Sequence, residues 1–597
     1  RALIIEDVGE ELDPVLDNLL EKNFVRVGKS LKVVIGDKEC DVDPNFRLYI
    51  TTKLPNPSYT PETFAKTTVI DFTVTMKGLE DQLLGRVILH EKAELEEQRR
   101  LLLEEINSCK KTAAKCEADL LHRLSSSEGN LLDDVSLIDV LNQTKRVSKE
   151  VKEKLGGAVE TEKKITEARE EFRPVANRGS ILYFVLTELS EVNAMYQTSL
   201  AKFLDLFDYS IAKSGKTLIT AKRITNIIEY ATSHIYRYVQ RGLYENDKPM
   251  YSLLVTLKID VNARKINHDA VGVLLKGGAA LDVDAVPKKP FAWIPDKAWL
   301  HLNALRELGE FRAITDEITR NEAAWKAWYD MEDPENGIIP SGYEERSTKF
   351  ARLVLIRCFR ADRTVAASTQ YIIDSLGKEY VEGIPLNLED VQAEMDPRTP
   401  VIALLSMGSD PTSSIELLAK KSKKKMSVVS MGQGQEIIAQ KLINDAMQTG
   451  GWVLLQNCHL AGKFMYDLED QLATVTEIDE DMRVWITVEP CVGFPINLLQ
   501  LSIKITNEPP QGLKAGLRRS YAWINQDMLD ITNAKEWKPL LYTMCFLHST
   551  LIERKKFGPI GFCVPYEFSQ PDLAASVQFV QNHLFSLEKQ KGISWDT

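Results

Sequence analysis

The sequence predicts a mixed fold, α/β plus α, in which α/β modules alternate with separate helical regions. Short apolar strands alternate with helical stretches between residues 401 and 505, a pattern typical of a parallel sheet with crossover helices. A second group of short strands dominates residues 1–75. Between the two groups, a pair of long helical arms joined by a polar turn predicts an antiparallel coiled-coil hairpin.

Size and composition exclude several classes of function. The chain has 597 residues, 44% hydrophobic and 27% charged, which is enough for several packed cores. A formal net charge of -12 argues against nucleic-acid binding, because neutralising phosphates requires a basic face. The dense basic run at 420–425 is interpreted as the solvated C-terminal end of a helix. Without a run of about 18 apolar residues or a signal peptide, we expect a soluble protein with no membrane contact.

The eight cysteines are scattered and lack the spacing of a zinc site, so we expect a reducing compartment and no metal centre. Cys458 and His459 are neighbours, and adjacent residues of a strand face opposite sides. They are therefore interpreted as a buried core residue beside an exposed histidine. The chain has no initiator methionine and opens on a buried-strand pattern at Ala2, so we expect it to belong to a longer protein.

The first strand group is interpreted as half of an α/β domain. Its strands are expected at 2–5, 31–35, 46–51 and 68–75, with turn residues between them. The first strand ends in Glu6 and Asp7, which have the form of the acidic pair on the metal side of a nucleotide site. The same two carboxylates could instead cap a turn. Both interpretations remain open, because the matching phosphate loop would lie before Arg1.

The hairpin is predicted from apolar residues that recur at alternating spacings of four and three. A polar cluster at 125–130 separates the two arms, and Pro174 ends the second arm. Arms of about 35 residues would make a hairpin roughly 50 Å long. The alternative is two ordinary surface helices, because the seam is thin and Gly156-Gly157 weakens the return arm. The seam positions are Leu102, Ile106, Cys109, Ala113, Cys116 and Leu120, followed by Val140, Thr144, Val147, Val151, Ala158, Thr161, Ile165, Ala168 and Phe172.

A P-loop requires glycines that let backbone N–H groups wrap the phosphates, a Lys, and a Ser or Thr hydroxyl for Mg²⁺. The triplet Gly215-Lys216-Thr217 has the right residue types, but a helical stretch precedes it where a P-loop requires a strand. It is interpreted as an interhelical turn. The glycines at 432 and 434 form only part of a dinucleotide fingerprint and are interpreted as a tight strand-to-helix turn.

The second strand group has the layout of a nucleotide site. Its strands are expected at 401–405, 427–430, 452–455, 484–488 and 501–505. The first of them runs into a segment that holds Gly408, Ser409 and Thr412 before a helix, where phosphates would sit. No Lys follows Gly408, and Pro411 removes a backbone donor. This segment is therefore a degenerate, non-binding version of a P-loop.

The metal side of the same site is also degenerate. The strand at 452–455 should end in the acidic pair that holds Mg²⁺, but it ends in Gln456 and Asn457. The Lys and the acidic pair that phosphoryl transfer requires are both absent from the positions of this site, so we expect this segment to have no catalytic residues.

The order of these parts resembles the fifth and sixth AAA+ modules in the motor ring of a dynein heavy chain. The runs at 406–412 and 555–561 are most similar to the gamma-type outer-arm axonemal heavy chains. The runs that carry the resemblance cover most of the chain: 4–14 (IIEDVGEELDP), 46–57 (FRLYITTKLPNP), 78–89 (GLEDQLLGRVIL), 430–436 (SMGQGQE), 452–460 (WVLLQNCHL) and 503–512 (IKITNEPPQG).

The resemblance implies P-loop-like AAA+ modules with parallel sheets, helical lids and an antiparallel coiled-coil hairpin. Residues 1–94 would be the C-terminal part of the large subdomain of the fifth module, and 95–178 a coiled-coil strut. The helical lid of the fifth module would span 179–290, and a helical connector 291–396. Residues 397–535 would form the degenerate large subdomain of the sixth module, and 536–597 the start of its lid.

In this family the ring hydrolyses ATP chiefly in its first module, and the strut braces a stalk whose tip binds microtubules. The resemblance implies a structural, force-transmitting part of a minus-end-directed motor in the cytoskeleton of a ciliary or flagellar axoneme. The full-length motor would be an ATPase that binds ATP or ADP with Mg²⁺. We expect neither a cofactor nor an intact hydrolysis site in this segment.

The implied partners are the rest of the ring and stalk, microtubules through a stalk tip outside this segment, and other dynein heavy, intermediate and light chains. Two alternatives come from other classes of protein: a standalone nucleotide-binding switch and a coiled-coil scaffold. Nucleotide binding would distinguish the first alternative, and chain missing on both sides argues against the second.

Overall fold

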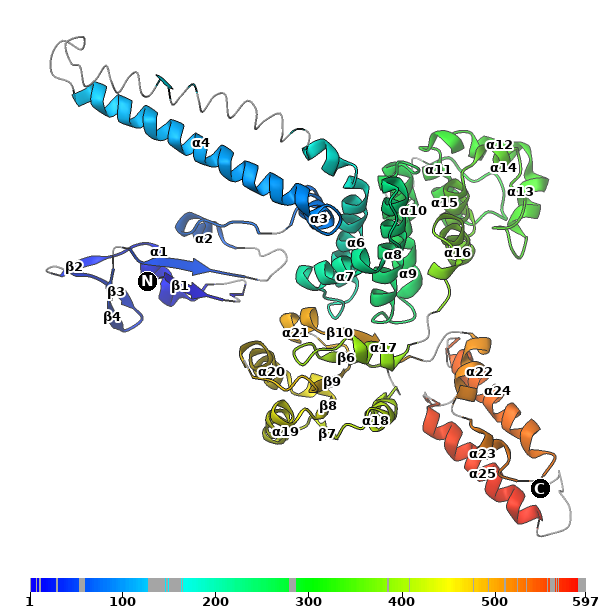
Figure 1. The fold of residues 1–597 in the computed structure, drawn as a ribbon. Helices are drawn as coiled ribbons and strands as arrows, with labels where there is room; N and C mark the ends of the chain where they lie inside the picture. Colours follow the sequence, from blue (N-terminus) through cyan, green and yellow to red (C-terminus); the bar gives the residue numbers. More distant parts are fainter. Residues whose placement is uncertain are drawn as a thin grey trace. The chain divides into compact units, whose positions relative to one another are not determined.

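The structure is a computed structural model that divides into two compact units, residues 1–75 and 76–597, and each is described by itself. It describes all residues except 1, 7, 10–11, 28–29, 44, 53–58, 73, 127–144, 147–148, 150–162, 164, 279–285, 384–385, 407–408, 476, 492, 509–511, 523, 533, 556, 559–563, 565, 567 and 589–597. Figure 1 shows the order of the elements along the chain.

The first unit holds two small sheets. Strands β1 (Ala2–Ile5) and β5 (Arg47–Ile50) pair in parallel. Strands β2 (Val25–Val27), β3 (Ser30–Ile35) and β4 (Lys38–Val42) form an antiparallel sheet. A 3-10 turn (Pro14–Leu16) leads into α1 (Asp17–Leu20), and α2 (Pro61–Lys66) follows β5. The ammonium group of Lys66 on α2 forms ion pairs with Asp17 of α1 and with Glu21 directly after α1, at 3.1 and 2.9 Å.

Three of the four strands expected in this unit are present, and the strand expected at 68–75 is wrong. The described residues of that segment form no strand, and Val69, Ile70 and Phe72 are exposed. The β-branched composition favoured a strand, but a strand requires a neighbour for its backbone hydrogen bonds. Strands β2 and β4 were not expected. The two-residue turn Gly36-Asp37, with Gly36 at φ +59°, was the available signal for the β3–β4 hairpin.

The second unit begins with α3 (Met76–Glu91) and continues into the 34-residue helix α4 (Ala93–Ser126). Helices α6 (Arg173–Val192), α7 (Leu200–Lys213), α8 (Thr220–Gln240), α9 (Lys248–Asn262) and α10 (His268–Lys276) follow. Helix α3 packs against α6 and α7 through an apolar face that includes Leu79, Leu83 and Val87. Gly179 of α6 lets these helices approach closely, because a Cβ atom there would lie 2.8 Å from Phe207 Cε2.

The described parts of the predicted hairpin have the geometry of antiparallel arms. Arg169 of the return arm forms an ion pair with Glu96 near the start of α4, at 3.2 Å. Ile106 and Ile165 are buried, as the seam predicts. Val140, Thr144, Val147, Val151, Ala158 and Thr161 lie outside the described residues, as does the turn between the arms.

A second group of helices surrounds a core that contains Trp325 and Trp328. This core also takes side chains from α9 and α10, so it continues across the glycine- and proline-rich segment at 277–290. Its elements are α11 (Asp296–Leu305), α12 (Ile314–Arg320), α13 (Glu322–Tyr329), α14 (Tyr343–Arg346), α15 (Lys349–Phe359) and α16 (Thr364–Ser375), with 3-10 turns at Gly309–Phe311, Ala361–Arg363 and Lys378–Tyr380.

After α17 (Leu388–Ala393) comes a sheet of five parallel strands in the order β10-β6-β9-β8-β7. The expected strands are confirmed to within two residues. They are β6 (Val401–Leu404), β7 (Met426–Ser430), β8 (Trp452–Gln456), β9 (Arg483–Val488) and β10 (Ile503–Thr506). The accompanying helices are α18 (Thr412–Lys421), α19 (Glu436–Thr449), α20 (Gly462–Thr474) and α21 (Ile496–Leu501).

The last helices form a small core of their own around Trp537 and Leu541. They are α22 (Leu513–Ala522), α23 (Gln526–Leu529), α24 (Trp537–Lys555) and α25 (Gln570–Glu588). Among the described residues, no helix is both long and apolar enough to cross a membrane.

Candidate functional site

The strand order of the five-stranded sheet determines where a ligand would bind. The chain passes from β6 to β7 at the far edge, returns through β8 and β9, and then places β10 on the other side of β6. In open parallel sheets, ligands bind beyond the carboxyl ends of the strands where the order reverses. The segment after β6 lies at this point and contains the predicted degenerate P-loop.

A carboxylate of the chain itself occupies the start of α18. Asp410 Oδ1 accepts a hydrogen bond from the backbone N–H of Thr412 at 2.9 Å, and the Thr412 hydroxyl also donates to it. Ser409 Oγ donates a hydrogen bond to the carbonyl of Ser406 at 3.0 Å, whereas Gly408 lies outside the described residues. Phosphates bind at helix N-termini because the free N–H groups and the helix dipole favour negative charge. Here Asp410 already supplies that charge, and it would repel a phosphate.

The structure brings the phosphate side and the metal side of the site together. Gln456 Nε2 donates to the hydroxyl oxygen of Thr412 at 2.6 Å. In a working P-loop site, the hydroxyl at this position and the acidic strand both serve the Mg²⁺ ion. In this chain the Gln456 amide bonds the Thr412 hydroxyl directly, in place of an arrangement around Mg²⁺. The described His, Cys, Asp and Glu residues form no group of three that could hold a metal ion.

Asn457 has a structural role at the end of β8. It adopts a left-handed conformation with φ +56°, and its amide group donates to Ser430 Oγ at 3.3 Å. The chain therefore leaves the strand at Asn457, and Cys458 and His459 lie in a 3-10 turn (Cys458–Leu460), not on a strand as expected. Cys458 is buried, which raises its pKa well above the usual range for a thiol. His459 is half-buried, and its Nδ1 accepts a hydrogen bond from the backbone N–H of Glu489.

The other candidate sites have simpler explanations. The interhelical turn predicted for Gly215-Lys216-Thr217 is confirmed, since these residues connect α7 to α8. The predicted strand-to-helix turn at 432–434 is also present, with Gly434 at φ +80°. Glu6 is exposed at the carboxyl end of β1, and Asp7 lies outside the described residues.

The contact between α8 and the edge strand β10 was not expected from the sequence. The backbone N–H of Thr506 donates to the carbonyl of Arg241 at 2.8 Å, and its hydroxyl donates to the carbonyl of Leu243 at 2.9 Å. Gly242 lies directly over Lys504, where a Cβ atom would be 2.9 Å from the Cβ of Lys504. The end of α8 therefore covers an edge of the sheet that would otherwise expose unpaired backbone groups.

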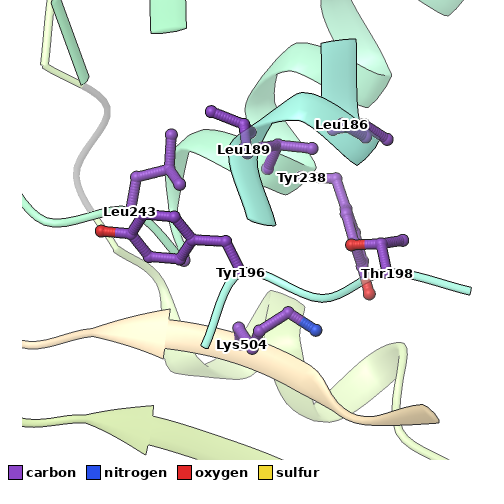
Figure 2. A pocket seen from close by; sticks show the side chains of 9 residues that line it. Leu186, Leu189, Tyr196, Thr198, Tyr238, Leu243 and Lys504 are labelled. Carbon is purple, nitrogen blue, oxygen red and sulfur yellow. The ribbon is translucent and has the colours of Figure 1, made fainter. Parts of the chain in front are cut away.

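A small pocket lies at this contact, and Lys504 extends along its floor (Figure 2). The ammonium group of Lys504 donates to the carbonyls of Leu499 and Ser502, at 2.6 and 3.3 Å. Burial, together with the positive charges of Lys202 and Arg241, lowers the pKa of Lys504 to about 7. The sequence feature that could have predicted this buried lysine is its position inside the apolar strand pattern SIKIT.

The chain is similar to dynein heavy chains over its whole length. Family models match residues 1–151 (ATP-binding dynein motor region), 396–506 (dynein heavy chain region D6 P-loop domain) and 537–597 (dynein heavy chain AAA lid domain). Identity is 57% to dynein axonemal heavy chain 8 of Homo sapiens and 55% to dynein axonemal heavy chain 5 of Mus musculus. It is 52% to the dynein gamma chain of the flagellar outer arm of Chlamydomonas reinhardtii. These alignments cover 100% of this chain but only 13% of each relative.

Proposed function

This chain belongs to the axonemal dynein heavy chains, and we propose that within such a motor it transmits force and does not itself hydrolyse ATP. The complete motor is proposed to be an ATP-driven, minus-end-directed microtubule motor of the ciliary or flagellar axoneme. Its partners are the rest of the ring and stalk, other heavy, intermediate and light chains, and microtubules bound by a stalk tip outside this segment. Nucleotide binding belongs to the dynein ATP-binding modules, and the hydrolysing module lies outside this segment.

One observation carries the proposal that this sheet does not hydrolyse ATP. Thr412 bonds both Asp410 and Gln456 where a nucleotide site would hold phosphate and Mg²⁺. Binding ATP there would require breaking these bonds and placing a polyanion beside the Asp410 carboxylate. We therefore propose that the sheet serves as a rigid part of the ring, with the end of α8 bonded to its β10 edge.

We expect the module at about 397–531 to bind neither ATP nor ADP with micromolar affinity in the presence of Mg²⁺, because it lacks the Lys and the acidic pair. Titration calorimetry on this module measures this directly, and saturable micromolar binding would contradict it. Asn457→Asp should not introduce binding, because the Lys would still be absent. The pair Asp410→Gly and Pro411→Lys removes the carboxylate and places a Lys before Thr412, so this variant should bind ATP measurably.

The strut is proposed to act through stiffness and through apolar contact between its arms. Ile106→Ala in the complete motor should leave basal ATP turnover nearly unchanged and weaken its stimulation by microtubules. Ile106 is buried, and truncating a buried aliphatic side chain costs about 2 to 5 kcal/mol in a full core, and less in a thin seam. The measurement is the ATPase rate with and without microtubules. Ile165→Ala on the other arm should act in the same way, whereas an equal loss of both rates would indicate general unfolding.

A further inference from the structure

The helix that leads into the strut is tied by ion pairs to three different helices of the lid. Besides its apolar face, helix α3 carries three charged side chains that pair with these helices, and Figure 1 shows α3 continuing into α4. One tie reaches the start of α6, one reaches α7 and one reaches α8. The pairs are Glu80 with Arg173, Arg86 with Asp208, and Glu91 with Arg223.

The Glu91–Arg223 pair has the geometry of a rigid joint. Both guanidinium-to-carboxylate contacts are short, at 2.6 Å from Nη2 and 3.0 Å from Nε. Arg223 is 4% exposed, so water screens this pair much less than a surface ion pair. A planar guanidinium that holds a carboxylate by two parallel bonds determines both distance and orientation.

Arg223 also holds the end of α7. Its remaining N–H groups donate to the carbonyls of Ile211, Ser214 and Gly215, at 2.9, 3.0 and 3.0 Å. These carbonyls belong to the last turn of α7 and the residues that follow it, where backbone acceptors have no partner inside the helix. One side chain of α8 therefore fastens the end of α7 and the end of α3 at the same point.

The joint lies immediately before the strut. The helical run is interrupted at Lys92, and α4 begins at the next residue. At this interruption Lys92 lies over the ring of Phe172, and within α4 Glu96 pairs with Arg169 of the return arm. Glu91, which pairs with Arg223, is therefore adjacent in sequence to Lys92, which contacts the return arm.

We propose that Arg223 positions the strut: through Glu91 it fixes the direction in which α4 leaves the lid, so that movement of the lid moves the strut. This inference rests on the proposed function of the strut and deepens it by naming the residues that couple strut and lid. The helix dipole disfavours a carboxylate at the C-terminal end of a helix, where Glu91 lies. The guanidinium of Arg223 offsets this unfavourable interaction. The role of Arg223 is to hold the geometry, and it takes no part in the ATPase chemistry.

Glu91→Ala in the complete motor tests the joint without removing the arginine that ends α7. Hydrogen exchange should become about tenfold faster in residues 86–98, because the local opening of the joint becomes easier. Exchange in α6 should not change. Microtubule stimulation of the ATPase should fall by more than half while basal turnover is retained. Glu97→Ala is the matched control, since Glu97 forms an exposed pair with Arg100 on the strut and should change neither measurement.

Hydrogen exchange tests whether the Glu91–Arg223 pair holds α3 in place, and microtubule stimulation of the ATPase tests whether the strut transmits force. Unchanged exchange at 86–98 in Glu91→Ala would overturn the proposal that Arg223 positions the strut. Faster exchange with full microtubule stimulation would keep the joint and overturn the proposed function of the strut in transmission. If Glu91→Ala unfolds the lid, Arg223→Lys provides the second test. This variant keeps the positive charge but loses the two parallel bonds to the Glu91 carboxylate. A hydrogen-exchange rate at 86–98 equal to that of wild type would again overturn the proposal.

Discussion

Replacing Lys504 with Met is expected to stabilise the second unit at pH 7 and to remove a pH dependence of its stability between about pH 7 and pH 10. Lys504 is buried beneath the end of α8, and the backbone carbonyls of Leu499 and Ser502 are the acceptors of its ammonium group. Met has nearly the same length and no charge, so it fits the same space with no ammonium group to desolvate.

The direction of this effect follows from proton binding. The pKa of Lys504 is about 7 in the folded chain, whereas an unfolded lysine has a pKa near 10.4. Between these values the unfolded chain holds a proton that the folded chain does not, so wild-type stability rises with pH across this window. The difference in free energy of unfolding across the window is on the order of 4 kcal/mol, because one pKa unit corresponds to about 1.4 kcal/mol. Two carbonyls lose a donor in the variant, at a cost of about 1 kcal/mol each.

Chemical denaturation at pH 7, 8, 9 and 10 measures this prediction. The variant should be more stable than wild type at pH 7, and its advantage should shrink and then reverse as pH approaches 10. Lys463→Met is the control, because Lys463 is exposed on α20 and its substitution should leave the pH dependence unchanged. Parallel pH profiles for wild type and Lys504→Met would show that Lys504 is not the titrating group.

Gly179→Val is expected to destabilise the packing of α3, α6 and α7 by about 3 kcal/mol. A Cβ atom at Gly179 would lie 2.8 Å from Phe207 Cε2 on α7 and 2.9 Å from Leu83 Cδ1 on α3. The valine would meet atoms of two different helices, so neither neighbour could move without disturbing the other contact. The ordinary gain from removing a helical glycine is only about 1 kcal/mol and does not offset this overlap.

Gly272→Ala is the matched control for this prediction. Gly272 also lies inside a helix, α10, but no atom lies within 4 Å of the place its Cβ would take. Its replacement should therefore stabilise the chain by about 0.5 to 1 kcal/mol. Thermal and urea unfolding of the two variants should show shifts of opposite sign. A stabilised Gly179→Val variant would mean that α3, α6 and α7 do not approach as closely as the structure shows.

Local patterns of the sequence predicted the elements that depend on local chemistry. The parallel strands β6 to β10 were evident from short apolar runs separated by helical stretches, because strands buried on both faces are apolar throughout. The degenerate nucleotide site stays a prediction, made because Pro411 and Asn457 are the wrong residue types for phosphate and Mg²⁺ binding wherever they lie in space. The seam positions Ile106 and Ile165 were evident from helical spacing.

The tertiary structure decided everything that depends on residues distant in sequence. The segment at 68–75 has the composition of a strand but no paired neighbour, and pairing is not a local property. The bond between Thr412 and Gln456 and the joint between Glu91 and Arg223 join residues 44 and 132 positions apart. The sequence alone determined the parallel sheet and the buried positions Ile106 and Ile165. Only folding decided which charged side chains are buried, because Arg223 and Lys504 leave water only once α8 packs against α6 and α7 and the residues after it cover β10.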